Sequence, residues 1–320
     1  MNRRVWTLAA IFVVLLLVYV VRWLAASSSS HRASGFVLEN IDPAAVTEII
    51  VIHQQDTVHL VKQGQQWLVE VDSAVYRPAS ENRIRTWLKT MEEARYLKIS
   101  QNPEKLAIFE VTEDKGIHVQ YRDHRGRVLA DFFVGKIGPD FTTSYVREAQ
   151  DNTVYLAEPG YRNVFPTRLE AWRERRLLPG VKPDEVVYLR LENPQDTLVL
   201  VRDPSGWRAE GAETTDTLAA KRLVRHVAMM TAVAFADTVP PESAGLTPPR
   251  RRLEVSTQNG TVYRILIGTP SPDGRGVYAL REGQPGIVLI SKYMDDQLDQ
   301  LPQEIRKPSE NTSSASGTSP

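Results

Sequence analysis

The sequence predicts an α+β fold in which an N-terminal transmembrane helix precedes two tandem homologous units, each a mainly antiparallel sheet with one amphipathic helix. Three observations predict this fold. An apolar run opens the chain, a segment near residue 50 recurs near residue 190, and short strand-like runs joined by turn signals surround one helical pattern. Strands connected by hairpins pair antiparallel, so a doubly wound nucleotide-binding sheet is disfavoured.

Residues 1–24 predict a signal-anchor that crosses a membrane once. After Arg3 and Arg4, only Thr7 and Arg22 are polar up to residue 24. A helix over this apolar run is about 30 Å long, which is the thickness of the hydrocarbon core of a bilayer. Because two basic residues and no acid precede the run, the positive-inside rule predicts a cytoplasmic N-terminus and a body on the other side of the membrane.

A cleaved signal peptide is the alternative interpretation of the same segment. Ala25, Ala26 and the serines at 27–30 are small enough for a signal peptidase. The apolar run is longer than the roughly 7 to 15 residues of a cleavable signal, which favours an uncleaved anchor. Residues 25–44 then form a tether, flexible over its serine run.

An internal repeat defines the body of the chain. Residues 49–70 match residues 189–210 at a constant offset of 140, with Trp67 facing Trp207. Further on, Gly135 at the end of one apolar run corresponds to Gly268 at an offset of 133. We therefore expect two homologous α+β units, a first repeat over residues 45–165 and a second over residues 184–297.

Each repeat begins with strands, continues with one helix and ends with further strands. The first helix carries apolar residues at i, i+3, i+4 and i+7, with Ser80 as its N-cap. Asn259-Gly260 between two alternating runs is a strong hairpin signal. The strands expected in the first repeat are 49–52, 58–61, 67–69, 117–121, 128–134, 144–147 and 154–157, and those in the second are 253–256, 262–267, 277–281 and 287–290. The apolar face of the expected helix is formed by Ile84, Trp87, Leu88 and Met91 in the first repeat, and the equivalent helical stripe in the second is formed by Leu223, Val227, Met230, Thr231 and Ala234.

The remaining segments connect or end the repeats. Residues 166–183 predict a linker with a short helix, in which Leu169, Trp172 and Arg176 share one face before Pro179-Gly180 stops it. Residues 298–320 form a C-terminal segment. It ends in a Ser, Thr, Pro and Gly tail from Pro308 that predicts disorder.

Composition excludes several classes of function. Lys plus Arg and Asp plus Glu are both 39, so the chain lacks the basic excess of a nucleic-acid-binding protein. It contains no Cys, which excludes disulfides, thiolate metal sites and Cys nucleophiles. No phosphate-binding, dinucleotide-binding, serine-hydrolase or metalloprotease motif occurs in the sequence. We expect a protein that is not an enzyme and that has no catalytic residues, no metal and no cofactor.

Some residues invite a functional interpretation but have a simpler structural one. His53, His59, His118 and His124 could assemble a metal site, but half-buried positions commonly hold histidine. Trp67 and Trp207 fit large core residues better than a ligand platform. Gly135 and Gly268 are explained by a need for positive φ at the end of a strand.

The basic cluster between the repeats is the candidate site. Trp172, Arg173, Arg175 and Arg176 could dock against the acidic surface of a partner or against lipid headgroups. A solvated helix face is the alternative for the same residues.

These elements together resemble a known bacterial family. The sequence resembles the DUF4340 family in its Phe133-Val134-Gly135 strand, its Tyr145-Val146-Arg147 strand and the run from Trp172 to Leu178. The resemblance covers residues 45–290. It implies an envelope protein of the bacterial inner membrane, with its body in the periplasm, often encoded beside ABC transporters of the gliding-motility type. It implies no reaction and no catalytic residue.

Two hypotheses about function follow. The first is a non-enzymatic accessory or scaffold subunit that contacts an ABC transporter permease or its auxiliary subunits. The alternative is a periplasmic module that captures a glycan or a small molecule at the junction of the two repeats, in a pocket lined by Trp172, Tyr161 or Arg173.

Overall fold

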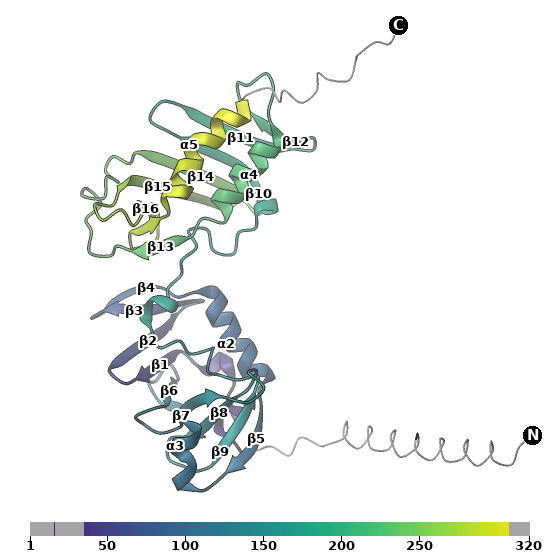
Figure 1. The fold of residues 1–320 in the computed structure, drawn as a ribbon. Coiled ribbons are helices and arrows are strands. Elements are labelled where there is room, and N and C mark those ends of the chain that lie inside the picture. Colours follow the sequence, from purple (N-terminus) through teal and green to yellow (C-terminus); the bar gives the residue numbers. More distant parts are fainter. Residues whose placement is uncertain (1–15, 17–34, 307–320) are drawn as a thin grey trace, which may run out of the picture. The chain divides into compact units, whose positions relative to one another are not determined.

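A computed structural model describes residue 16 and residues 35–306 of the chain (Figure 1). Three predicted segments lie outside the described residues. They are the anchor (except for residue 16), the first part of the tether and the disordered tail. Within residues 35–306, no helix is both long and apolar enough to span a bilayer. The described chain forms two compact units. Unit 1 holds the residues up to Val46 together with Thr90–Phe165, and unit 2 holds Thr47–Lys89 together with the residues from Pro166 onward.

Unit 1 is built on antiparallel strands in the order β6-β7-β8-β9-β5. One face of these strands carries an aromatic core. Phe36, just before the short 3-10 helix η1 (Val37–Asn40), lies 4.6 Å from Tyr96 between ring centroids, and the Tyr96 and Tyr161 hydroxyls are 2.7 Å apart. The elements are β5 (Arg95–Ser100), α3 (Leu106–Phe109), β6 (Ile117–Arg122), β7 (Val128–Ile137), β8 (Ser144–Glu148) and β9 (Val154–Glu158).

The first part of unit 2 is an antiparallel array in the order β4-β3-β2-β1. Helix α2 (Glu81–Glu93) follows it, and its first turns pack an apolar face on the strands, where Trp67 and Trp87 meet edge to face at 5.4 Å. The strands are β1 (Glu48–His53), β2 (Asp56–Gln63), β3 (Gln66–Asp72) and β4 (Val75–Pro78).

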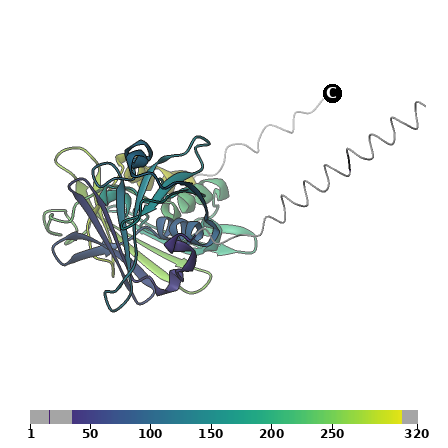
Figure 2. The same cartoon turned by 90° about the horizontal axis from the view of Figure 1, so that it is seen from below.

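The second part of unit 2 is an eight-stranded antiparallel sheet in the order β12-β11-β10-β14-β15-β16-β17-β13. Helices α4 (Thr217–Ala228) and α5 (Lys292–Arg306) lie side by side on one face of this sheet (Figures 1 and 2). The strands are β10 (Val186–Glu192), β11 (Thr197–Asp203), β12 (Gly206–Ala209), β13 (Ala232–Phe235), β14 (Arg251–Thr257), β15 (Val262–Pro270), β16 (Val277–Arg281) and β17 (Val288–Ile290).

Antiparallel sheets with few helices confirm the α+β class, and every predicted strand is present with each end within three residues of its predicted position. The neighbour order also recurs: β3-β2-β1 matches β12-β11-β10, and β6-β7-β8-β9-β5 matches β14-β15-β16-β17-β13. The sequence repeat therefore has a counterpart in the strand order. Unit 2 takes in residues 47–89, which the repeat assigns to its first copy.

Two helix predictions in the second repeat were wrong. Helix α4 ends at Ala228, and Ala232–Phe235 form strand β13 against β17, so Met230, Thr231 and Ala234 lie beyond the helix. The prediction of one helix per repeat missed α5, whose Leu298, Leu301 and Ile305 are buried against the sheet. A short apolar run fits the spacing of either a helix or a strand, and pairing with a distant strand decides which of the two forms.

The predicted helix within residues 166–183 is also absent. Its backbone forms one 3-10 turn, Leu169–Ala171, and then runs extended. The amides and carbonyls after this turn bond to neighbouring strands, which removes the local hydrogen bonds that a helix needs.

Gly135 and Gly268 hold equivalent positions, but the predicted reason, a positive φ, was wrong. Neither has a positive φ. A Cβ on Gly135 would lie 2.1 Å from the carbonyl oxygen of Phe109, and a Cβ on Gly268 would lie 1.9 Å from that of Ala244. Close approach of another backbone segment therefore requires glycine at both positions.

Candidate functional site

The basic segment 172–178 is held between two strands of unit 2. Its first half bonds to the end of β4, where the amide of Ser80 donates to the carbonyl of Trp172 (2.7 Å) and the amide of Glu174 donates to Pro78 (2.9 Å). Its second half bonds to the start of β13, where the amide of Ala232 donates to the carbonyl of Arg175 (2.7 Å). The segment is therefore fixed along its length. Because it is extended, successive side chains point to opposite sides of it.

Trp172 and Arg173 are buried within unit 2. The Trp172 indole Nε1 donates to the carbonyl of Pro166 at 2.7 Å. The Arg173 side chain is 7% exposed, and its guanidinium carbon lies 3.5 Å from the centre of the Phe235 ring. Both of its terminal nitrogens donate to Asp237, Nη2 at 3.0 Å from Oδ1. Neither residue offers its polar group to a surface.

Asp237 joins Arg173 to strand β4. The Arg77 Nε donates to Asp237 Oδ1 at 2.7 Å, so one carboxylate accepts from two arginines. Burial raises the pKa of Asp237, but the hydrogen bonds from Arg173 and Arg77 outweigh it, and the pKa lies below its ordinary value. Asp237 is thus an anion at neutral pH and neutralises part of this basic cluster.

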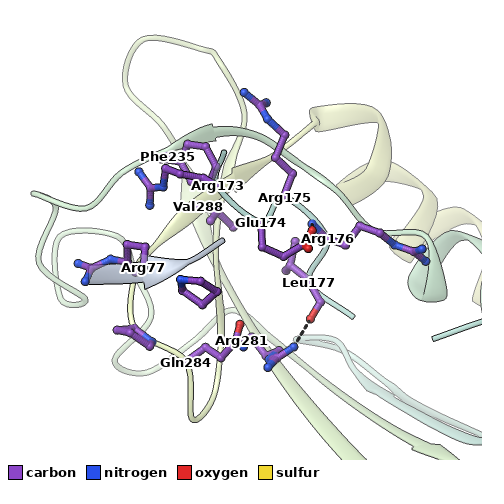
Figure 3. A pocket seen from close by; sticks show the side chains of 13 residues that line it. Arg77, Arg173, Glu174, Arg175, Arg176, Leu177, Phe235, Arg281, Gln284 and Val288 are labelled. Carbon is purple, nitrogen blue, oxygen red and sulfur yellow. Dashed lines mark hydrogen bonds between the residues drawn. The ribbon is translucent and has the colours of Figure 1, made fainter. Parts of the chain in front are cut away.

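Arg175 and Arg176 also line the cavity beside Arg77, Arg173 and Arg281, but their guanidinium groups extend away from it (Figure 3). The Nη2 of Arg176 donates to the carbonyls of Val181 and Ala228, both at 3.0 Å, and so caps the C-terminal end of α4. The Arg175 side chain is exposed. Of the four predicted docking residues, Arg175 is the most exposed, and its Nη1 donates to the carbonyls of Ala232 and Val233, both at 3.4 Å.

The cavity in Figure 3 is small, about 40 Å³, which suits a water molecule rather than a ligand. Arg281 closes it by donating from Nη1 to the carbonyl of Leu177 at 3.3 Å. Burial lowers the pKa of Arg281 from its usual value. This guanidinium also lines the neighbouring groove, where it lies 5.6 Å from the ring centre of Tyr263.

A groove of about 700 Å³ beside this cavity is the largest hollow that we identify in the described part of the chain. It combines amides, aromatic rings, two guanidinium groups and carboxylates with apolar side chains from the first turns of α2. Its lining residues are Gln63, Gln65, Gln66, Trp67, Pro78, Ala79, Glu81, Ile84, Arg85, Leu88, Glu174, Pro179, Tyr263, Arg281 and Gln284. This mixture suits a polar molecule with apolar surfaces.

The groove includes few of the residues that the sequence singled out. Trp67 fills the core as predicted and also lines the groove. Tyr161 lies in unit 1, buried against Tyr96, and Trp172 is buried elsewhere in unit 2, so neither lines it. The glutamines around the β2–β3 turn were the available signal, since three occur in four positions.

Two of the four histidines considered as metal ligands, His59 and His118, are bonded to carboxylates. The two ring nitrogens of His59 lie 2.7 Å from Glu70 and 2.8 Å from Glu48, and His118 pairs with Asp131. Hydrogen bonding to His59 is the largest cause that lowers the pKa of Glu70. Over the described residues, no group of three or more His, Asp or Glu side chains is arranged to hold a metal ion.

Comparison with known proteins places the chain in a family. Over 148 residues it is 19% identical to a protein of Treponema pallidum (strain Nichols) described as an uncharacterized protein, an alignment that covers 44% of this chain and 47% of the relative. The match thus spans about half the length of that relative. No solved structure matches the chain. The model of a family described as a domain of unknown function (DUF4340) matches residues 67–249 and 242–311, which is most of the body, and the chain therefore belongs to the DUF4340 family.

Proposed function

We propose that the chain is a single-pass inner-membrane protein whose periplasmic body is a non-enzymatic accessory subunit of an ABC transporter system of the cell envelope. In this proposal, the body holds an extended segment of a transporter permease or auxiliary subunit in the groove of unit 2. The apolar run after Arg3 and Arg4 supports the anchor, and the family resemblance supports the association.

The groove of about 700 Å³ is the observation that carries the binding role. Its volume falls within the range of about 300 to 1,000 Å³ that is usual for ligand sites. An extended peptide presents backbone amides and carbonyls to both sides, and the glutamine amides of the β2–β3 turn match both kinds of group. Trp67 and Leu88 give apolar contact between these polar groups.

Capture of a glycan is the second candidate. Aromatic rings beside amide and guanidinium groups also suit sugar rings, and Tyr263 and Arg281 provide this combination next to Gln284. Both candidates use the same groove, so the identity of the captured molecule distinguishes them.

Photocrosslinking in native membranes tests the proposal. A photoreactive amino acid replaces Gln65, which is exposed on the groove, and in a matched variant replaces Gln300, which is exposed on α5 outside the groove. A Gln65-dependent adduct that mass spectrometry identifies as a permease or auxiliary subunit of a transporter supports the accessory role. An adduct with an oligosaccharide favours the glycan candidate. Equal labelling at both positions contradicts a binding role for the groove.

A further inference from the structure

Unit 1 exposes large apolar side chains on neighbouring elements. Leu97 is 64% exposed and Ile99 41% exposed on β5, Ile108 is 58% exposed on α3, and Phe141 is 82% exposed in the β7–β8 loop. Single exposed apolar residues are common on protein surfaces, but a contiguous group indicates an interaction site. The question is therefore whether these four side chains lie together.

Strand register and contacts place them around one sheet face. Leu97 is opposite Leu156 on β9, and Leu156 is opposite Tyr145 on β8, so the three share a face. The Phe109 ring lies 4.6 Å from that of Tyr145, which brings α3 and Ile108 onto this face. We call Leu97, Ile99, Ile108 and Phe141 the apolar rim.

The loop that carries Phe141 is built to present this ring. A Cβ on Gly138 would lie 3.2 Å from Leu156 Cδ1, so the loop starts against the same face. Asp140 Oδ1 then accepts from the amides of Thr142 (3.1 Å) and Thr143 (3.0 Å). Phe141 itself has a φ of 61°, a left-handed conformation that is uncommon for a bulky residue. The fold therefore holds an aromatic side chain out in solvent.

The chain also enters unit 1 beside β5, on the sheet face opposite to Leu97 and Leu156. Phe36 packs on Tyr96, the neighbour of Leu97 on β5, and on Tyr155, whose ring centre is 5.1 Å away on β9. The amide of Val37 donates to Glu148 at 2.8 Å. Residues 25–35 separate this point from the apolar N-terminal run. Even fully extended, they reach only roughly 35 to 40 Å.

We infer that the apolar rim rests in the interface of the lipid bilayer that holds the N-terminal anchor. This inference rests on the membrane anchor of the proposed function. The short connection keeps β5 near the bilayer, and the rim gives this edge an apolar surface that lipid covers. Arg95, exposed on β5 and on the same face as Leu97, faces headgroup phosphates, while Glu158, opposite it on β9, and Glu104 keep the local charge mixed. Apolar contact therefore dominates the interaction.

A second copy of the chain fits this edge less well than lipid does. Strand β5 is last in its sheet order, but its register shifts between Lys98 and Ser100. Such an irregularity, together with basic side chains, opposes strand pairing between two edges.

Single-cysteine labelling of the full chain tests the inference, since the protein contains no Cys. Leu97→Cys and Phe141→Cys each receive a nitrobenzoxadiazole probe, and Val128→Cys, an exposed apolar position at the other end of β7, is the matched control. The proteins are reconstituted into vesicles of equal parts phosphatidylcholine and phosphatidylglycerol. Probes at positions 97 and 141 are expected to shift their emission to shorter wavelength and to be quenched by brominated lipid, whereas the probe at 128 is not.

The other outcomes separate the two proposals. If the protein floats with vesicles but the three probes behave alike, the inference about the apolar rim is overturned and the anchor stands. If the protein does not float with vesicles, both the anchor and this inference fail. If the shift at 97 and 141 grows with protein density and bromolipid does not quench it, a second copy covers the rim and the lipid contact is overturned.

Discussion

Arg173 and Asp237 form a two-point ion pair across 64 residues of sequence, with Nη2 and Oδ1 3.0 Å apart. The Phe235 ring covers the guanidinium at 3.5 Å, and Arg77 binds the same carboxylate. The pair therefore fixes segment 172–178 to β4 and to the residues after β13. Arg173, one of the predicted docking residues, thus has a structural role inside unit 2.

Replacing Arg173 tests this role. We expect Arg173→Ala to lower the free energy of unfolding by about 2 to 4 kcal/mol, because it leaves Asp237 without one of its partners in a partly buried site. Arg175→Ala, which removes an exposed arginine with long hydrogen bonds to the carbonyls of Ala232 and Val233, should change it by no more than about 1 kcal/mol. Urea denaturation of the detergent-solubilised chain, followed by tryptophan fluorescence, measures both. Similar losses in the two variants would refute the assignment.

Asp237 gives stability a pH dependence. Its pKa is lowered in the folded state, so the charged form stabilises the fold above the unfolded pKa of about 3.9, and this contribution is lost as pH falls through the folded value. In Asp237→Asn, the urea midpoint should fall less steeply between about pH 5 and pH 3 than in the unaltered protein. Parallel profiles for the two proteins would show that Asp237 does not contribute.

Gly135 is expected to tolerate no side chain. Gly135→Ala places a Cβ 2.1 Å from a backbone oxygen, so the strand or the α3 segment must move, and we expect a loss of more than about 2 kcal/mol. Gly126→Ala is the control, because Gly126 has a φ of 73° but no atom within 4 Å of an added Cβ. Its cost should be about 1 kcal/mol, from the left-handed backbone alone. Thermal unfolding should show that Gly135→Ala is the more destabilising variant. If positive φ were the main constraint, Gly126→Ala would be the more destabilising one.

Helix α5 is expected to be a stabilising part of unit 2. Leu298 on this helix is fully buried, so Leu298→Ala should lower the free energy of unfolding by about 2 to 5 kcal/mol through lost contacts and a cavity. Leu218 on α4 is 72% exposed, and Leu218→Ala should change the stability by less than about 0.5 kcal/mol. The midpoints of chemical denaturation compare the two. An equal, small effect would mean that α5 contributes little to the stability of the sheet.

The elements that were predicted correctly are those whose sequence pattern lies within a few neighbouring residues. Asn259-Gly260 carries its own turn geometry, with Gly260 at a φ of 83°, so strands β14 and β15 could be placed from a few residues. Helix α2 could be placed from the spacing of Ile84 and Trp87.

Elements that depend on distant partners were missed. The spacing of Leu298, Leu301 and Ile305 fits a helix, but only a C-terminal segment without a helix was predicted for these residues. Arg173 and Arg176 looked like a docking surface because their partners Asp237 and Ala228 lie more than fifty residues away. The groove could not be predicted, since its lining residues, among them Trp67 and Arg281, are far apart in the sequence and come together only in the folded chain.

The carboxylate of Glu174 also bears on the order in which the protein can assemble. It accepts from the amide of Glu81, at 3.1 Å, the first residue of α2, and these residues are 93 positions apart. During synthesis on a ribosome, α2 therefore emerges long before the group that caps it. A chain stalled between residues 93 and 174 has the whole helix but not its cap, and we expect the native form of this helix end only after Glu174 has left the exit tunnel.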